Sequence, residues 1–129
     1  GDESRPALER LTRFFGDMAA MYEEGQGHAG QVPGCPFGNL AVELGTTNPR
    51  IRERVATIFA RAEARFANLL AIARERGEVD LDDAGLAERA QRLFAYFQGA
   101  QVLAKTRADP QVLRELAPGA LALARGGCD

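Results

Sequence analysis

Three side chains in this sequence could take part in thiol or metal chemistry: Cys35, Cys128 and His28, the only histidine. Cys35 lies between Gly34 and Pro36, just before an expected helix start, and a helix N-terminus can activate a thiol. However, no lysine or arginine occurs within ten residues of Cys35 on either side. We therefore prefer a small, unreactive thiol in a turn, with redox sensing as the alternative.

A metal or catalytic centre is not indicated by these residues. Zinc ligands usually occur at close, regular spacing, whereas His28 and the two cysteines are scattered along the chain. A Cys–His hydrolase also needs a third orienting group and an oxyanion site, and the sequence shows neither. We expect no cofactor and no catalytic residue, we do not expect an enzyme, and we interpret His28 as a solvated loop residue.

Length and composition predict one all-α domain spanning residues 1–129. Alanine, leucine, arginine and glutamate dominate, and no segment alternates apolar with polar residues. The formal net charge of −2 is spread over mixed acidic and basic positions, so this chain alone should bind nucleic acid poorly. No apolar run is long enough to cross a bilayer and no secretory signal is recognisable, which makes the cytoplasm the expected compartment.

The first helix is expected to start at a Ser4 cap, with Pro6 in its opening turn. Its apolar residues recur at steps of three and four, which predicts one buried face. Gly25 and Gly27 should end it, because glycine favours helix C-termini. Residues 25–34 contain four glycines and a proline, so we predict a flexible loop there.

The middle of the chain predicts one short and two long helices. The short helix should span residues 37–44 and end at Gly45. Asn48 should cap the first long helix, which starts at Pro49 and stops near Gly77. The second long helix should span residues 83–107, with three aspartates around its positive end.

A last helix is expected after an Asp109 cap, with Pro110 at its first position. Pro118 cannot donate a hydrogen bond to the carbonyl of Arg114, so we predict a kink there or two short helices. The fold class is therefore an all-α bundle of about five helices.

Several apolar and polar side chains are candidates for a ligand pocket. The first helix and the turn after it contribute aromatic and methionine residues, which could equally be plain core: Phe14, Phe15, Met18, Met21, Tyr22 and Phe37. On the first long helix, Glu63 lies between Phe59 and Phe66 without a basic residue three or four positions away. It is either a polar anchor for a ligand or a solvated residue at the edge of the apolar face. On the next helix, Phe94, Gln98 and Gln101 are similar mixed candidates.

The joints between the expected helices resemble the C-terminal domain of TetR-family transcriptional regulators. "GCPFGNLAVEL" (34–44) is similar to the family's Gly-Cys-x-x-Gly-Asn-x-x-x-Glu-Leu segment, and "NPRIRERV" is similar to the start of its next helix. "ARERGEVD" resembles its helix-ending turn, and "FQGAQVLAKTRADPQVLREL" resembles its last two helices. These joints occur in the family's order and cover nearly the whole chain from Pro6 onward.

The resemblance implies a cytoplasmic, bacterial ligand-sensing and dimerisation domain of a TetR-like repressor. A small, mostly apolar effector would bind among the helices, at the candidate residues named above. Homodimers would form an intersubunit four-helix bundle from the last two helices, through Ala95, Gly99, Val102, Leu103, Leu113, Leu116, Ala120, Leu121 and Leu123. Operator DNA would be bound only through an N-terminal helix-turn-helix that this chain lacks, which suggests excision from a longer regulator.

Two other classes of function remain open. A stand-alone helical carrier of apolar small molecules would keep the pocket and have no DNA partner. An enzyme would need converging titratable groups, which the sequence does not show. The sequence does not name the ligand, the regulated genes or the operator, and it does not decide whether Glu63 and Cys35 face a pocket.

Overall fold

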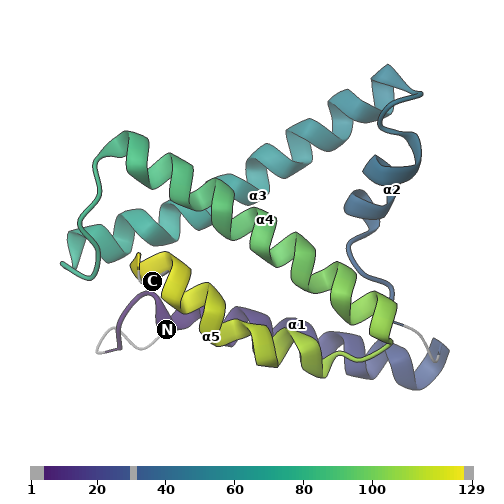
Figure 1. Ribbon diagram of the computed structural model, residues 1–129, viewed down its shortest axis with the longest axis horizontal. Helices are drawn as coiled ribbons and strands as arrows, with labels where there is room; N and C mark the ends of the chain where they lie inside the picture. Colours follow the sequence, from purple (N-terminus) through teal and green to yellow (C-terminus); the bar gives the residue numbers. More distant parts are fainter. Residues whose placement is uncertain (1–4, 30–31, 127–129) are drawn as a thin grey trace.

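The computed structural model describes residues 5–29 and 32–126, and these residues form five α-helices and no strand. Figure 1 shows α3 crossing α4, with α5 and α1 side by side below them. Helix α2 lies at the right of the view, next to the N-terminal part of α3. The closest helix pairs are α1 with α5, α3 with α4, α4 with α5, and α2 with α3. The predicted all-α fold class is confirmed.

Helix α1 spans Glu9–Ala29, so both predicted ends were wrong. It continues through Gly25 and Gly27 into the segment predicted to be a loop, and His28 therefore lies in a helix. Glycine only weakens a helix, by about 1 kcal/mol relative to alanine, and does not block it. The predicted Ser4 cap lies outside the described residues.

The start of α1 is fixed by a distant carboxylate. The backbone N–H groups of Ala7 and Leu8 donate to the two carboxylate oxygens of Glu78, at 2.7 and 3.0 Å. Glu78 lies in the turn between α3 and α4, about seventy residues away in sequence. It satisfies donors that the opening turn of a helix leaves without an internal partner.

Helices α2 and α3 follow their predicted capping signals. Helix α2 spans Pro36–Leu44, and the Sγ of Cys35 accepts a hydrogen bond from the backbone N–H of Gly38 at 3.4 Å. Helix α3 spans Pro49–Glu75, and the side chain of Asn48 caps it through the backbone N–H of Ile51. These two predictions are confirmed to within two residues at each helix end.

Helix α4 spans Asp83–Arg107, as predicted, and the Asp82 side chain caps it by accepting from the N–H of Gly85 at 2.7 Å. Helix α5 spans Gln111–Arg125 as one helix with Pro118 inside it. Of the two alternatives predicted at Pro118, two short helices is therefore wrong, and a kink stays a prediction. The carboxylate of Asp109 accepts from the backbone N–H of Gln111, close to the predicted cap.

Two side chains of α4 hold α5 in place through its backbone. The hydroxyl of Tyr96 donates to the carbonyl of Leu116 at 2.8 Å, and the guanidinium of Arg89 donates to the carbonyl of Ala124 at 3.0 Å. Pro118 cannot donate to the carbonyl of Arg114 within the helix, and the Tyr96 contact adds a bond to α5 two residues further along, at Leu116.

One hydrophobic core runs between α1, α3, α4 and α5. Its largest fully buried side chains are Phe15, Leu8, Leu11, Leu70, Leu93 and Leu113. Within the described part of the chain, no helix combines the length and apolar character that a membrane span requires.

Candidate functional site

A cavity of about 850 Å³ lies between α1, the segment 33–39, α3 and α4. Its lining is mostly apolar and aromatic, which is typical of small-molecule sites. The residues that line it are Arg10, Leu11, Phe14, Met18, Met21, Tyr22, Pro33, Gly34, Cys35, Pro36, Phe37, Asn39, Ile58, Phe59, Ala62, Arg65, Phe66, Leu69, Phe94, Phe97, Gln98 and Gln101.

Aromatic rings from three helices build two walls of the cavity. The ring of Phe14 lies 4.8 Å from that of Phe97 and 6.0 Å from that of Phe66, measured between centroids. The rings of Phe59 and Phe94 form a second pair at 5.0 Å. Tilted and edge-on packing at these distances is favourable, so the walls are held in shape by contacts between helices.

A buried polar pair interrupts the apolar lining. The side-chain nitrogen of Gln101 on α4 donates to the hydroxyl of Tyr22 on α1 at 2.7 Å. Burial raises the pKa of Tyr22, partly offset by this hydrogen bond, so the phenol stays neutral at physiological pH. Among the described residues, the Oε1 of Gln101 is the one buried side-chain polar atom without a hydrogen-bond partner.

The turn at residues 33–39 forms another side of the cavity. Gly34 adopts φ = +71°, a left-handed conformation that favours glycine, and its buried backbone lies beside the Lys105 side chain. The side-chain nitrogen of Asn39 donates to the carbonyl of Pro33 at 3.0 Å and braces the turn. Cys35 lines the cavity and caps α2, which supports the interpretation of this segment as a turn beside a pocket.

Ten of the twelve predicted ligand-binding residues line this one cavity, and Phe15 and Glu63 do not. Phe15 is fully buried in the core and Glu63 is half-buried on α3. Phe14 lines the cavity while the next residue, Phe15, packs in the core, and Ala62 lines it while the next residue, Glu63, does not. Glu63 therefore does not face this cavity in the structure described.

Sequence reasoning missed several lining residues. Phe97 lies one turn after Phe94 on α4 and both are buried, so the spacing of these two phenylalanines could have identified Phe97. Arg10 and Arg65 are exposed arginines on α1 and α3, and no sequence pattern distinguished them from other surface arginines. They are the only charged residues among the described lining, and they give the cavity a positive rim.

The predicted dimer residues fall into three groups. Leu113 and Ala120 are fully buried by α1 and α4 within one chain, so they offer no surface to a partner in this conformation. Leu116, Leu121 and Leu123 are half-buried. The α4 residues remain open to solvent, namely Ala95, Gly99, Val102 (53% exposed) and Leu103 (38% exposed).

Two of the candidates for thiol or metal chemistry are Cys128 and His28. Cys128 lies outside the described residues, and nothing is described of the His28 side chain. Across residues 5–29 and 32–126, no group of three His, Cys, Asp or Glu side chains is arranged to hold a metal ion.

Comparison with known protein families identifies one match. The family described as "Tetracyclin repressor-like, C-terminal domain" matches residues 7–119. A search of curated proteins and a search of solved structures each returned no match. The family match covers most of the chain, including every helix that lines the cavity.

Proposed function

This chain belongs to the family of tetracyclin repressor-like C-terminal domains, and from that premise we propose that it is the effector-sensing and dimerisation domain of a TetR-like transcriptional repressor. Its effector is a small, mostly apolar molecule. Domains of this family are regulatory, and this function requires no bond-making chemistry.

The cavity of about 850 Å³ carries this proposal. Its size falls within the usual range of small-molecule sites, and its walls come from three helices that are far apart in sequence. A ligand there contacts α1, α3 and α4 at once. Binding energy can therefore favour one arrangement of these helices over another.

We propose that the effector acts by population shift. A ligand changes the balance between two conformations only as far as its affinities for them differ. Helix α1 is the element best placed to respond, because Phe14, Met18 and Met21 line the cavity while Phe15 and Ala19 of the same helix pack in the core. In the intact repressor, a shift of α1 would alter the separation of the paired DNA-binding domains.

The dimer contact in this proposal uses the solvent-exposed face of α4. Ala95 and Gly99 lie one turn apart there and allow close approach of a second helix, while Val102 and Leu103 supply apolar area. A two-fold axis would place this face against its own copy. Leu113 and Ala120 stay in the core of each chain.

Filling the cavity tests the sensing function. Ala62→Phe places a large ring among the lining residues of α3, and Ala64→Phe places the same ring on the exposed side of the same helix. The probe is 1-anilinonaphthalene-8-sulfonate, an apolar anionic dye, and its fluorescence reports binding. We expect saturable binding by the parent chain and by Ala64→Phe, and at least tenfold weaker binding by Ala62→Phe. Equal binding by all three proteins would contradict the proposal.

The regulatory role is tested by the DNA that precedes the codon for Gly1. An open frame of about sixty codons encoding a basic helix-turn-helix supports the repressor. A start codon directly before Gly1 would contradict it and would favour a stand-alone binding protein.

A further inference from the structure

The unpartnered oxygen of Gln101 sets a requirement on the chemistry of the ligand. Gln101 is 4% exposed, lines the cavity, and uses its side-chain nitrogen to bind Tyr22. A buried amide oxygen without a partner is costly, because it has lost its hydrogen bonds to water and gained none in the protein. A ligand group that donates a hydrogen bond to this oxygen would remove that penalty, whereas an apolar ligand would leave it in place.

The geometry restricts this ligand group further. Rotating the Gln101 amide by half a turn would let its oxygen accept from the Tyr22 hydroxyl, and would leave the side-chain nitrogen unpartnered instead. A hydroxyl group satisfies both arrangements, because it can donate and accept. An ether or a ketone only accepts, and an ammonium only donates. In the arrangement described, the atom without a partner is the oxygen, so a ligand group that only accepts leaves it unpartnered.

The charges around the cavity exclude one class of ligand. Within the described lining the charged side chains are Arg10 and Arg65, and no carboxylate is present. A cationic ligand would therefore meet like charge at the rim and find no anion inside. Glu63, the one carboxylate considered from sequence, does not line the cavity.

We infer that the cavity selects mostly apolar, neutral or anionic molecules that carry a hydroxyl group, and that this hydroxyl pairs with Gln101. The inference rests on the proposed ligand-sensing function and specifies the chemical class of the effector. The hydroxyl lies beside Tyr22, and the apolar body of the ligand lies along the aromatic walls of Phe14 and Phe59.

Three matched probes test the inference on the intact chain: trans-4-hydroxystilbene, trans-4-methoxystilbene and unsubstituted stilbene. Their dissociation constants are measured by displacement of the anionic dye. We expect the hydroxyl compound to bind about tenfold more tightly than either of the other two. The methoxy compound separates hydrogen bonding from size, because it is larger than the hydroxyl compound, cannot donate a hydrogen bond, and should still bind more weakly.

Two variants test whether Gln101 causes the preference for the hydroxyl compound. Gln101→Met removes the amide at similar length and should reduce the hydroxyl preference to about one. Gln91→Met makes the same change at an exposed position of α4 and should leave the preference intact. The comparison of probes on the parent chain needs no variant, so it holds even where Gln101→Met fails to fold.

The outcomes separate two kinds of failure. Equal affinities for the three probes on the parent chain, or a preference that survives in folded Gln101→Met, would overturn this inference and leave the sensing function standing. Binding of neither dye nor probes would overturn both. A 4-aminomethylstilbene cation should bind at least tenfold more weakly than the hydroxyl compound, and tighter binding of the cation would also overturn the inference.

Discussion

The side-chain nitrogen of Gln101 lies 2.7 Å from the hydroxyl oxygen of Tyr22, although the two residues are 79 positions apart in sequence. This bond joins α4 to α1 in the wall of the cavity. It puts a buried polar pair at the junction of α1 and α4, beside the apolar lining.

Alkaline titration should report the burial of both tyrosines. Burial raises the pKa of Tyr22 and of Tyr96 above the ordinary value of about 10. The free energy of unfolding should be at its full value below that pH and should fall as the pH rises through the raised values, because the unfolded chain ionises first. Phenolate absorbance measures this directly, since the chain has two tyrosines in all.

The denatured chain in guanidinium provides the reference for that titration. Tyr22→Phe and Tyr96→Phe assign the two transitions. A folded chain whose phenols titrate together at the denatured-state midpoint would show that neither ring is buried as described.

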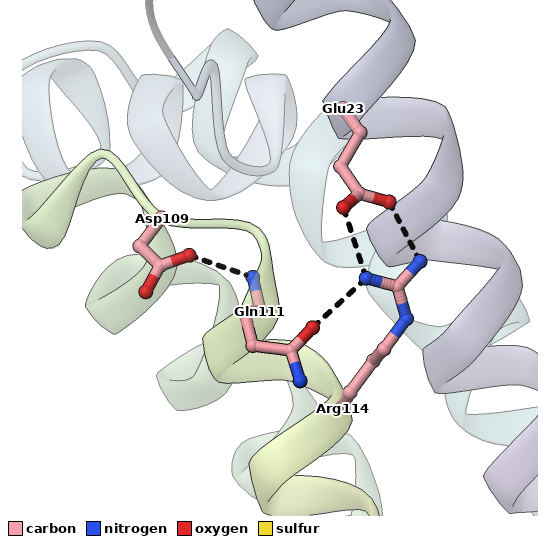
Figure 2. Close-up of polar contacts among 4 residues, drawn as sticks. All are labelled: Glu23, Asp109, Gln111 and Arg114. Atoms are coloured by element: carbon pink, nitrogen blue, oxygen red, sulfur yellow. Dashed lines mark hydrogen bonds and ion pairs between the residues drawn. The ribbon is translucent and has the colours of Figure 1, made fainter.

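The pair Glu23–Arg114 should link α1 to α5 in a way that depends on pH. Figure 2 shows the two terminal nitrogens of the Arg114 guanidinium directed at the Glu23 carboxylate. They donate to its two oxygens at 2.6 and 3.0 Å, and one of them also donates to the side-chain oxygen of Gln111. The hydrogen bonds from Arg114 lower the pKa of Glu23. The coupling therefore stabilises the fold above the ordinary glutamate pKa of about 4.3 and is lost as the pH falls through the lowered value.

A double-mutant cycle with Glu23→Gln and Arg114→Gln measures this coupling by urea unfolding. Both groups are exposed, so we expect a small coupling that added salt weakens further. A coupling that is unchanged by salt and by acid would contradict an ionic origin.

Gly119→Ala should destabilise the chain by about 1 to 3 kcal/mol. A Cβ at this position would lie 2.2 Å from the hydroxyl oxygen of Tyr96, so the ring must move and its bond to Leu116 must break. Gly16→Ala is the matched control inside α1, where no heavy atom lies within 4 Å of the added Cβ. It should stabilise by about 0.5 to 1 kcal/mol through helix propensity.

Thermal and urea unfolding measure both glycine variants. Adding Tyr96→Phe to Gly119→Ala removes the closest clash and should recover part of the lost stability. If Gly119→Ala stabilises as much as Gly16→Ala, the described packing of Tyr96 against α5 is wrong.

Val102→Asp should disrupt the proposed homodimer. Val102 is 53% exposed on α4, so the change should leave the chain folded while placing a charge in the interface. Ala64→Asp is the control, because it adds the same charge at an exposed position of another helix, α3. Light scattering should give twice 13.9 kDa for the parent and for Ala64→Asp, and about 13.9 kDa for Val102→Asp. A parent chain that is monomeric at all concentrations would contradict the dimer.

The sequence predicted the middle helices well because their ends depend on local signals. Asn48 with Pro49, and Asp82 at the start of α4, cap helices through hydrogen bonds to residues three positions away. The start of α1 depends instead on Glu78, about seventy residues distant. A helix end fixed by a tertiary contact leaves no trace in the local sequence.

The residue types of the candidate site could be predicted from the sequence, but the direction in which each side chain points could not. Aromatic and methionine residues on the correct helices were identified, yet periodicity did not decide between Phe14 and Phe15, or between Ala62 and Glu63. Those choices depend on the rotation of each helix about its axis, which packing against other helices determines. The same limit applied to Leu113 and Ala120, which α1 and α4 cover within one chain.

The most direct test of the sensing function uses the two methionines of the chain, Met18 and Met21, both of which line the cavity. Their methyl groups are labelled with carbon-13 and followed by NMR during titration with trans-4-hydroxystilbene. We predict that both methyl resonances shift, that the shifts saturate together, and that Ala62→Phe abolishes them. Methyl resonances that stay unchanged while the probe binds would place the ligand elsewhere and contradict the proposed site.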